Sequence, residues 1–106
     1  MTQSRIEVFE QMLSSDPNNT MVLFGLAKEY EKNGDGAKLI ETLERYLATA
    51  DDEGNAYGML ARAYERAEQP AKAQEAYQRG IEAATRHGHP GMAEEYRQVL
   101  EEFSAP

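Results

Sequence analysis

A repeat of 34 residues constrains the fold of this chain more than any other feature of its sequence. Residues 20–53 align with residues 54–87 without a gap and share nine identities, whereas two unrelated segments of this length share about two. Leu26, Ala27 and Tyr30 all recur one repeat later. A unit of this length is typical of a helix pair that is too small to bury its own apolar face. The sequence therefore predicts helix pairs that become stable by stacking.

Six segments carry apolar residues at helical spacing, and turn residues separate them. Asp16-Pro17 ends the first segment, because proline restricts the residue before it and cannot continue the hydrogen-bond ladder. Asn18 or Asn19 is suited to cap the next helix, and Asp35 the one after it. We expect a single helical domain over residues 1–106, with a helix at 2–15, repeat units at 20–53 and 54–87, and a capping helix at 90–104.

Further turn signals agree with these boundaries. Gly34 follows the first helix of the first repeat unit, a place where a left-handed residue commonly ends a helix. The acidic run at 51–53 suits the N-terminus of the next helix, because the macrodipole favours negative charge there. Pro70 suits the first position of the fifth helix, since the amide that proline lacks would have no partner at that position.

Composition and charge exclude several classes of function. The chain has no cysteine and a formal net charge of -8, so disulfides and thiolate metal sites are ruled out. The negative charge opposes binding to nucleic acid or to an anionic membrane, because their phosphates would repel the molecule. Arg5, Glu7 and Glu10 interrupt the apolar residues near the N-terminus, and no apolar run approaches the roughly 18 residues of a membrane span. We expect a cytoplasmic protein that binds neither nucleic acid nor membranes.

Residues suited to catalysis or metal binding are sparse. The two histidines, His87 and His89, lie in one loop, and no serine is placed to pair with them as a nucleophile. Glu94 and Glu95 follow, but two imidazoles on one loop are a weak start for a metal site. We interpret these residues as solvated polar side chains, and we expect no enzymatic activity, no metal and no cofactor.

The pattern inside the repeat resembles the tetratricopeptide repeat. That family has a large apolar residue, then Leu followed by Gly or Ala, then Tyr on the first helix, and Ala and an aromatic residue on the second. The matching residues here are Leu23, Leu26, Ala27, Tyr30 and Gly34 in the first unit, and Tyr57, Leu60, Ala61, Tyr64, Ala73 and Tyr77 in the second. The resemblance implies an all-α fold, a right-handed α-α superhelix (solenoid) of antiparallel helix pairs. It also implies a non-catalytic module that acts by protein–protein contact.

The chain departs from the family pattern at several positions. Glu68 stands where the second unit would have its turn glycine, and Leu39 and Tyr46 stand where the family prefers small residues. Residues 2–14 match only the second helix of a unit, so we expect a half repeat there. The segment after Pro90 leaves the repeat register, and we expect it to cap the array with a polar outer face.

The resemblance places the binding site in the concave groove, which the exposed side of each unit's first helix lines. The residues that it assigns to this groove are Met21, Phe24, Lys28, Lys32, Asn55, Gly58, Met59, Arg62 and Arg66. The four cations would form two rungs one repeat apart, Phe24 and Met59 would add apolar surface, and Gly58 would leave space for a ligand backbone. Such a groove favours a protein or peptide segment with carboxylates beside an apolar anchor.

Another set of charged residues is interpreted as scaffold. Lys38, Glu41 and Arg45 recur one repeat later. The glutamate lies four residues before the arginine, which is the favourable orientation for a helical pair worth about 0.2 to 0.5 kcal/mol.

Self-association is the alternative function. The first helix lacks its usual partner, and Ile6, Phe9 and Leu13 lie on one flank of it. Through these residues the helix would dock on another copy of the chain, which would make the protein a homo-oligomeric structural piece instead of an adapter.

Overall fold

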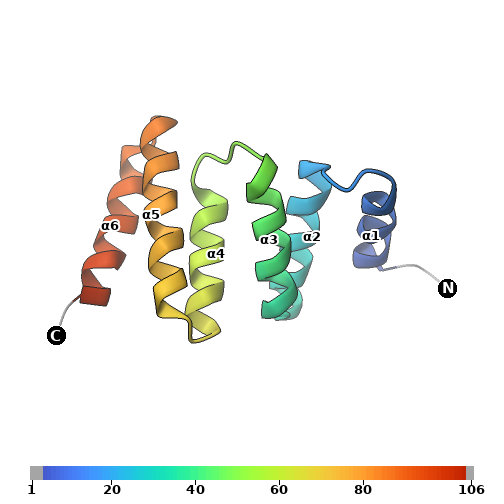
Figure 1. Ribbon diagram of the computed structural model, residues 1–106, viewed down its shortest axis with the longest axis horizontal. Helices are drawn as coiled ribbons and strands as arrows, with labels where there is room; N and C mark the ends of the chain where they lie inside the picture. The colour runs from blue at the N-terminus through green and yellow to red at the C-terminus, as the bar shows by residue number, and fades with distance from the viewer. Residues whose placement is uncertain (1–3, 105–106) are drawn as a thin grey trace. The chain divides into compact units, whose positions relative to one another are not determined.

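The computed structural model describes residues 4–104, and it is helical as predicted. In these residues there are six α-helices and no strand (Figure 1). The helices are α1 (Arg5–Ser15), α2 (Thr20–Asn33), α3 (Gly36–Thr49), α4 (Asn55–Arg66), α5 (Pro70–Arg86) and α6 (Pro90–Ser104). Residues 2 and 3 of the helix expected at 2–15 lie outside the described residues.

The helices form two compact units. Unit 1 ends at Ala50 and contains α1, α2 and α3, whereas unit 2 begins at Asp51 and contains α4, α5 and α6. In unit 1, α2 packs against both α1 and α3; in unit 2, α5 packs against both α4 and α6. Each unit therefore has a central helix with a neighbour on either side.

The core of unit 1 is the seam between α2 and α3. Leu23 and Ala27 of α2 are fully buried, and so is Leu43 of α3. Their burial follows from the repeat pattern, because residues three and four positions apart fall on one face of a helix. The hydroxyl of Tyr30, at the end of the same stripe, donates a hydrogen bond to Glu10 of α1 over 3.1 Å, so the buried ring also ties α1 to α2.

The core of unit 2 uses smaller side chains and one large wedge. Ala56 and Ala61 of α4 are fully buried, which lets α5 approach closely. The ring of Tyr96 in α6 packs against Gly58 and Gly80, where an added Cβ would come within 2.3 Å and 2.9 Å of the ring or its hydroxyl. The hydroxyl donates to the carbonyl of Gly54 over 3.0 Å. This wedge attaches α6 to both other helices of the unit.

Side-chain caps mark the helix starts that the sequence predicted. Asn19 accepts from the amide of Val22 at the start of α2, and Asp35 accepts from that of Lys38 at the start of α3. In unit 2, the Asp52 carboxylate accepts from the amides of Gly54 and Ala56, at 2.8 and 2.9 Å. The acidic run at 51–53 thus provides a negatively charged cap at the N-terminus of α4, as the sequence predicted.

The turns after α2 and α4 have the same backbone structure although their residues differ. Gly34 adopts a φ of 74°, and Glu68, at the equivalent position, adopts a φ of 59°. The next amide in each turn donates back to a tyrosine carbonyl, from Asp35 to Tyr30 and from Gln69 to Tyr64, at 3.0 and 2.9 Å. Glu68 therefore holds a left-handed conformation that favours glycine, because its Cβ crowds the backbone there.

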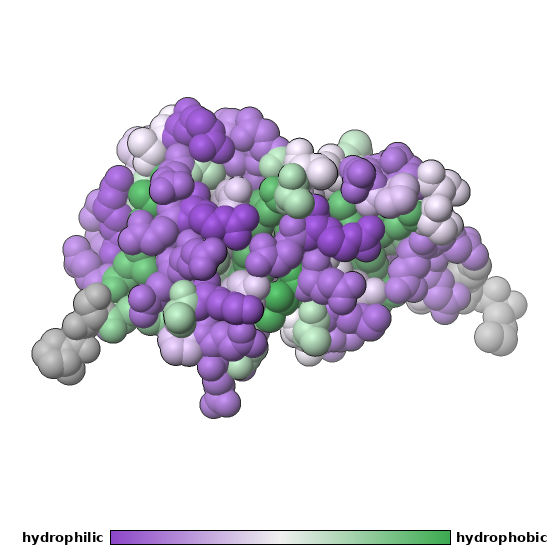
Figure 2. Space-filling view, in the orientation of Figure 1, coloured by the Kyte–Doolittle hydropathy of each residue, from purple (hydrophilic) through white to green (hydrophobic). Residues whose placement is uncertain are grey.

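One face of the molecule is drawn in Figure 2, and it is mainly hydrophilic. Figure 2 shows charged and polar side chains over most of the visible face, with apolar residues in narrow strips between them. Among residues 4–104, each helix is too short or too polar to cross a lipid bilayer.

Replacing Glu68 with glycine should stabilise the protein. Glycine removes the strain at the positive φ, so we expect the free energy of unfolding to rise by about 1 kcal/mol. Urea denaturation followed by circular dichroism measures this change. Gly34→Ala is the matched control and should lower stability by a similar amount; a destabilised Glu68→Gly variant would show that the Glu68 side chain contributes more than its backbone strain costs.

Candidate functional site

The exposed face of α2 carries the residues of unit 1 that the sequence assigned to the groove. Met21 is 85% exposed, Lys28 and Lys32 are exposed, and Phe24 is half-buried. Since these residues are spaced by three and four positions, they share one face of α2. The structure therefore brings all four together as one surface of unit 1.

An aromatic pair lies at the centre of this surface. The ring of Phe24 contacts that of Tyr46 in α3, with centroids 5.2 Å apart and planes tilted by 44°. The ammonium of Lys28 lies 5.7 Å from the centroid of the Phe24 ring, within the range of a cation–π contact. Met21, Phe24 and Tyr46, together with Thr20, line an open depression of about 310 Å³. We call these residues, with Lys28 and Lys32, the Phe24 surface.

The assignment of groove residues from the sequence did not include Tyr46. Tyr46 lies in the second helix of its repeat unit. The predicted groove residues came only from the first helix of each unit, so Tyr46 was not among them. A signal was nevertheless present, because Tyr46 stands where the tetratricopeptide pattern prefers a small residue. In the structure that extra bulk supports the Phe24 ring.

Unit 2 presents the expected residues only in part. Asn55, Arg62 and Arg66 are exposed on α4. Met59, expected to supply apolar surface, is instead 2% exposed and belongs to the buried residues. Gly58 does not leave open space either, because Tyr96 of α6 fills the position in front of it. The accessible groove residues of unit 2 are thus polar and cationic, without an apolar anchor.

The residues expected to mediate self-association lie mostly against α2. Leu13 is buried. The ring of Phe9 packs on Gly25, with its Cζ 3.1 Å from the position of an added Cβ. Ile6 is half-buried. The apolar residues that α1 exposes are Val8, at 39%, and Met12, at 49%, so the exposed flank differs from the predicted one.

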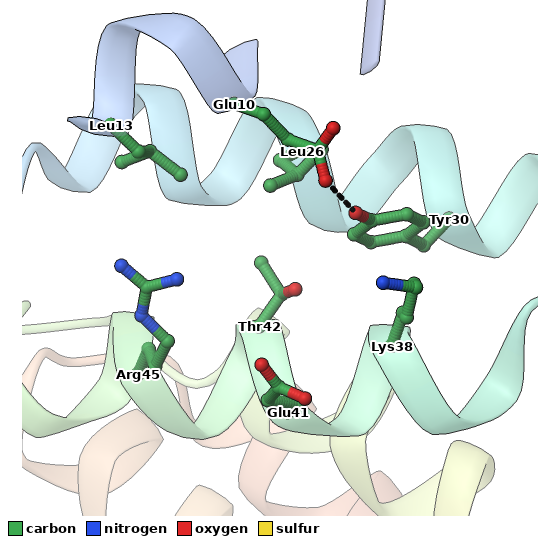
Figure 3. A pocket seen from close by; sticks show the side chains of 8 residues that line it. All are labelled: Glu10, Leu13, Leu26, Tyr30, Lys38, Glu41, Thr42 and Arg45. Carbon is green, nitrogen blue, oxygen red and sulfur yellow. Dashed lines mark hydrogen bonds between the residues drawn. The ribbon is translucent and has the colours of Figure 1, made fainter. Parts of the chain in front are cut away.

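A polar slot lies on unit 1 between α1 and α3, above α2 (Figure 3). It has a volume of about 140 Å³, and its lining residues are Glu10, Leu13, Leu26, Tyr30, Lys38, Glu41, Thr42 and Arg45. Burial, followed by the hydrogen bond to Glu10, raises the pKa of Tyr30 to about 12. The expected pair between Glu41 and Arg45 is not formed; a guanidinium nitrogen of Arg45 donates to the carbonyl of Pro17 over 3.0 Å.

The two histidines bind carboxylates of the acidic run instead of being merely solvated. His87 Nε2 lies 3.0 Å from Asp51 Oδ1, and His89 Nε2 lies 2.5 Å from Glu53 Oε1. Arg86 also contacts Asp51, at 3.3 Å. These contacts join the segment before α4 to the loop after α5. Within residues 4–104, no three histidine or carboxylate side chains are grouped so that they could hold a metal ion.

The histidine contacts predict a pH dependence of stability. The hydrogen bond from His87 holds the pKa of Asp51 below its ordinary 3.8, and that from His89 holds the pKa of Glu53 below its ordinary 4.5. Because both values are lowered on folding, the pairs stabilise the fold above about pH 4 and lose this effect as the pH falls through the lowered values.

A variant with His87→Gln and His89→Gln tests this dependence. We expect it to melt at a lower temperature than the unchanged chain at pH 5, and we expect the two melting temperatures to converge in stronger acid. Thermal melts followed by circular dichroism across this pH range measure the difference. A constant offset at every pH would contradict the explanation.

Comparisons with known proteins agree with this architecture. No family model matches the chain. The chain is 31% identical over 83 residues to the TPR repeat-containing protein PA0015 of Pseudomonas aeruginosa, and the alignment covers 78% of this chain and 79% of that protein.

Solved structures show the same fold. The solution structure of protein BPP2914 from Bordetella parapertussis superposes with a TM-score of 0.76 at 22% identity, over 97% of this chain and 90% of the other. A crystal structure of MamA superposes with a TM-score of 0.70 at 24% identity over 90% of this chain, which spans 64% of the MamA chain.

The relative from Pseudomonas aeruginosa establishes the family, because the two sequences are 31% identical over more than three quarters of each chain. Members of that family generally act as non-catalytic modules that bind other proteins. The resemblance read from Leu26, Ala27, Tyr30 and their repeats is therefore confirmed: the chain belongs to the tetratricopeptide repeat family.

Proposed function

We propose that this protein is an adapter that binds a segment of another protein on the Phe24 surface of unit 1. The observation that carries the proposal is the open depression bounded by Met21, Phe24 and Tyr46, with Lys28 beside it. The segment would place one apolar side chain in the depression and its carboxylates near the lysines.

Exposure and adaptability make this depression suited to an apolar anchor. Met21 is the most exposed large apolar side chain of the described residues, and an unbranched thioether adapts to partners of irregular shape. The Phe24 and Tyr46 rings form a firm base, because each packs on the other. An aliphatic or aromatic side chain of the partner would remove all three from water, which is the main source of affinity at such a surface.

Charge complementarity favours an acidic partner. Lys28 and Lys32 lie one helical turn apart on the exposed face of α2. These cations stand out on a chain whose net charge is -8. Carboxylates of the partner would pair with them, which speeds encounter and selects against basic partners more than it raises affinity.

Selection from a random peptide library displayed on phage tests this function. We expect enriched peptides to combine a large apolar residue with aspartate or glutamate. The affinity of an enriched peptide should fall at least about tenfold in Phe24→Ala, since loss of a buried aromatic contact exceeds about 1.4 kcal/mol. It should also fall in Lys28→Glu. Arg97→Glu, the same charge reversal on α6, is the control and should bind normally. Enrichment of peptides without acidic residues would refute the proposed specificity.

Self-association remains a second candidate function, now through Val8 and Met12. These two residues are exposed one turn apart on α1, and pairing of two α1 helices would cover them. Light scattering after size-exclusion chromatography should then show a dimer that forms with rising concentration, and Val8→Lys with Met12→Lys should abolish it. A strict monomer at high micromolar concentration would rule out this candidate.

A further inference from the structure

We propose that the polar slot between α1 and α3 is a second binding site, for an extended protein segment that carries a basic and an acidic side chain two residues apart. This site is separate from the Phe24 surface. Leu26 and Tyr30 on its floor are offset by two positions from Phe24 and Lys28. Two positions correspond to about 200° around a helix, so the slot and the Phe24 surface lie on opposite sides of α2.

Two buried hydroxyl groups make the slot a polar site instead of a gap between apolar side chains. Tyr30 is 5% exposed and Thr42 is 4% exposed, and both line the slot. The Tyr30 hydroxyl donates to Glu10, and its burial together with this hydrogen bond raises its pKa to about 12. That hydrogen bond holds the Glu10 carboxylate beside the Tyr30 hydroxyl, on the α1 side of the slot (Figure 3). One wall of the site is therefore positioned before any ligand arrives.

The end of the slot near Tyr30 has an excess of negative charge. Glu10, Glu41 and Asp35 all act on the Tyr30 hydroxyl through their charges. Glu41 makes no hydrogen bond or ion pair with any residue in the described range 4–104. Lys38 is the cation at this end, and its ammonium lies over the Tyr30 ring, 5.8 Å from the centroid. Glu10 and Glu41 are the two carboxylates that line the slot. Lys38 balances one of them, and one further cation, a lysine or arginine of a partner, would balance the other.

The other end of the slot is cationic. The guanidinium of Arg45 lies there, below Leu13 of α1 (Figure 3). One of its nitrogens donates to the carbonyl of Pro17, which fixes the side chain and leaves further N–H groups for a ligand. An aspartate or glutamate of the partner fits this end, because a guanidinium binds a carboxylate through paired hydrogen bonds.

The spacing of the two ends selects the form of the partner. Glu41 and Arg45 are four residues apart on α3, which is about 6 Å along a helix axis. In an extended segment, alternate side chains point the same way and lie about 7 Å apart. The slot's volume of about 140 Å³ leaves room for a few side chains but not for a whole helix, which is about 10 Å across. The matching sequence is therefore a basic residue, any residue, then an acidic residue.

A titration followed by nuclear magnetic resonance tests the site on the full chain. The probe is the blocked peptide Ala-Lys-Ala-Glu-Ala, and the control peptide has glutamine in place of both charged residues. We expect saturable shifts at the amides of Leu13, Tyr30 and Thr42 with the probe alone. The dissociation constant should be on the order of 1 mM, since exposed ion pairs contribute little each.

Matched variants assign the binding to the two ends. Glu41→Gln and Arg45→Gln should each weaken binding of the probe about threefold or more, whereas Lys28→Gln with Lys32→Gln, on the other side of α2, should not change it. Equal shifts with both peptides, no saturation, or full affinity in folded Glu41→Gln and Arg45→Gln variants would each overturn the proposal. Because Lys28 belongs to the Phe24 surface, these results are independent of the phage selection.

Discussion

Close contact between paired helices is the constraint on which each unit depends. In unit 1 the fully buried Leu23, Ala27 and Leu43 form the seam between α2 and α3. In unit 2 buried alanines of α4 and α5 form much of the corresponding seam. A helix of twelve to seventeen residues has little stability alone, so its conformation depends on this tertiary contact. The side chains on the outer faces do not take part in this contact and can vary. Unit 1 exposes an apolar residue, Met21, on α2, whereas Met59 of α4 in unit 2 is buried.

Buried tyrosines show how polar atoms are accommodated at these seams. Tyr30 donates to Glu10, and Tyr77 donates to Glu65 over 2.6 Å. Burial is the largest cause that raises the pKa of each phenol, so both remain neutral donors. A buried hydroxyl without a partner would cost about 1 to 3 kcal/mol. Each hydroxyl donates to a carboxylate on the surface. The rings can therefore fill the core without leaving a buried polar atom unpaired.

Local signals in the sequence predicted the local structure well. Asn19, Asp35 and Pro70 start helices where proposed, because capping depends on residues only a few positions away. The outcome at Gly58 and Met59 could not be predicted in this way. Whether those positions are open depends on Tyr96 and other side chains far along the chain. Tyr46 was recognisable as unusual, but its contact with Phe24 required the positions of two helices.

The bond from Tyr96 to the carbonyl of Gly54 spans 42 residues, and it gives unit 2 a particular order of folding. Most helix contacts in the described chain join consecutive helices, and such short-range contacts form rapidly. Bringing Tyr96 onto Gly54 and Gly58 of the α4 segment closes a much longer loop, which carries a larger entropic cost. During synthesis, the glycine-lined seam of α4 and α5 therefore stays accessible to water until Tyr96 has left the ribosome, whereas unit 1 has by then emerged in full.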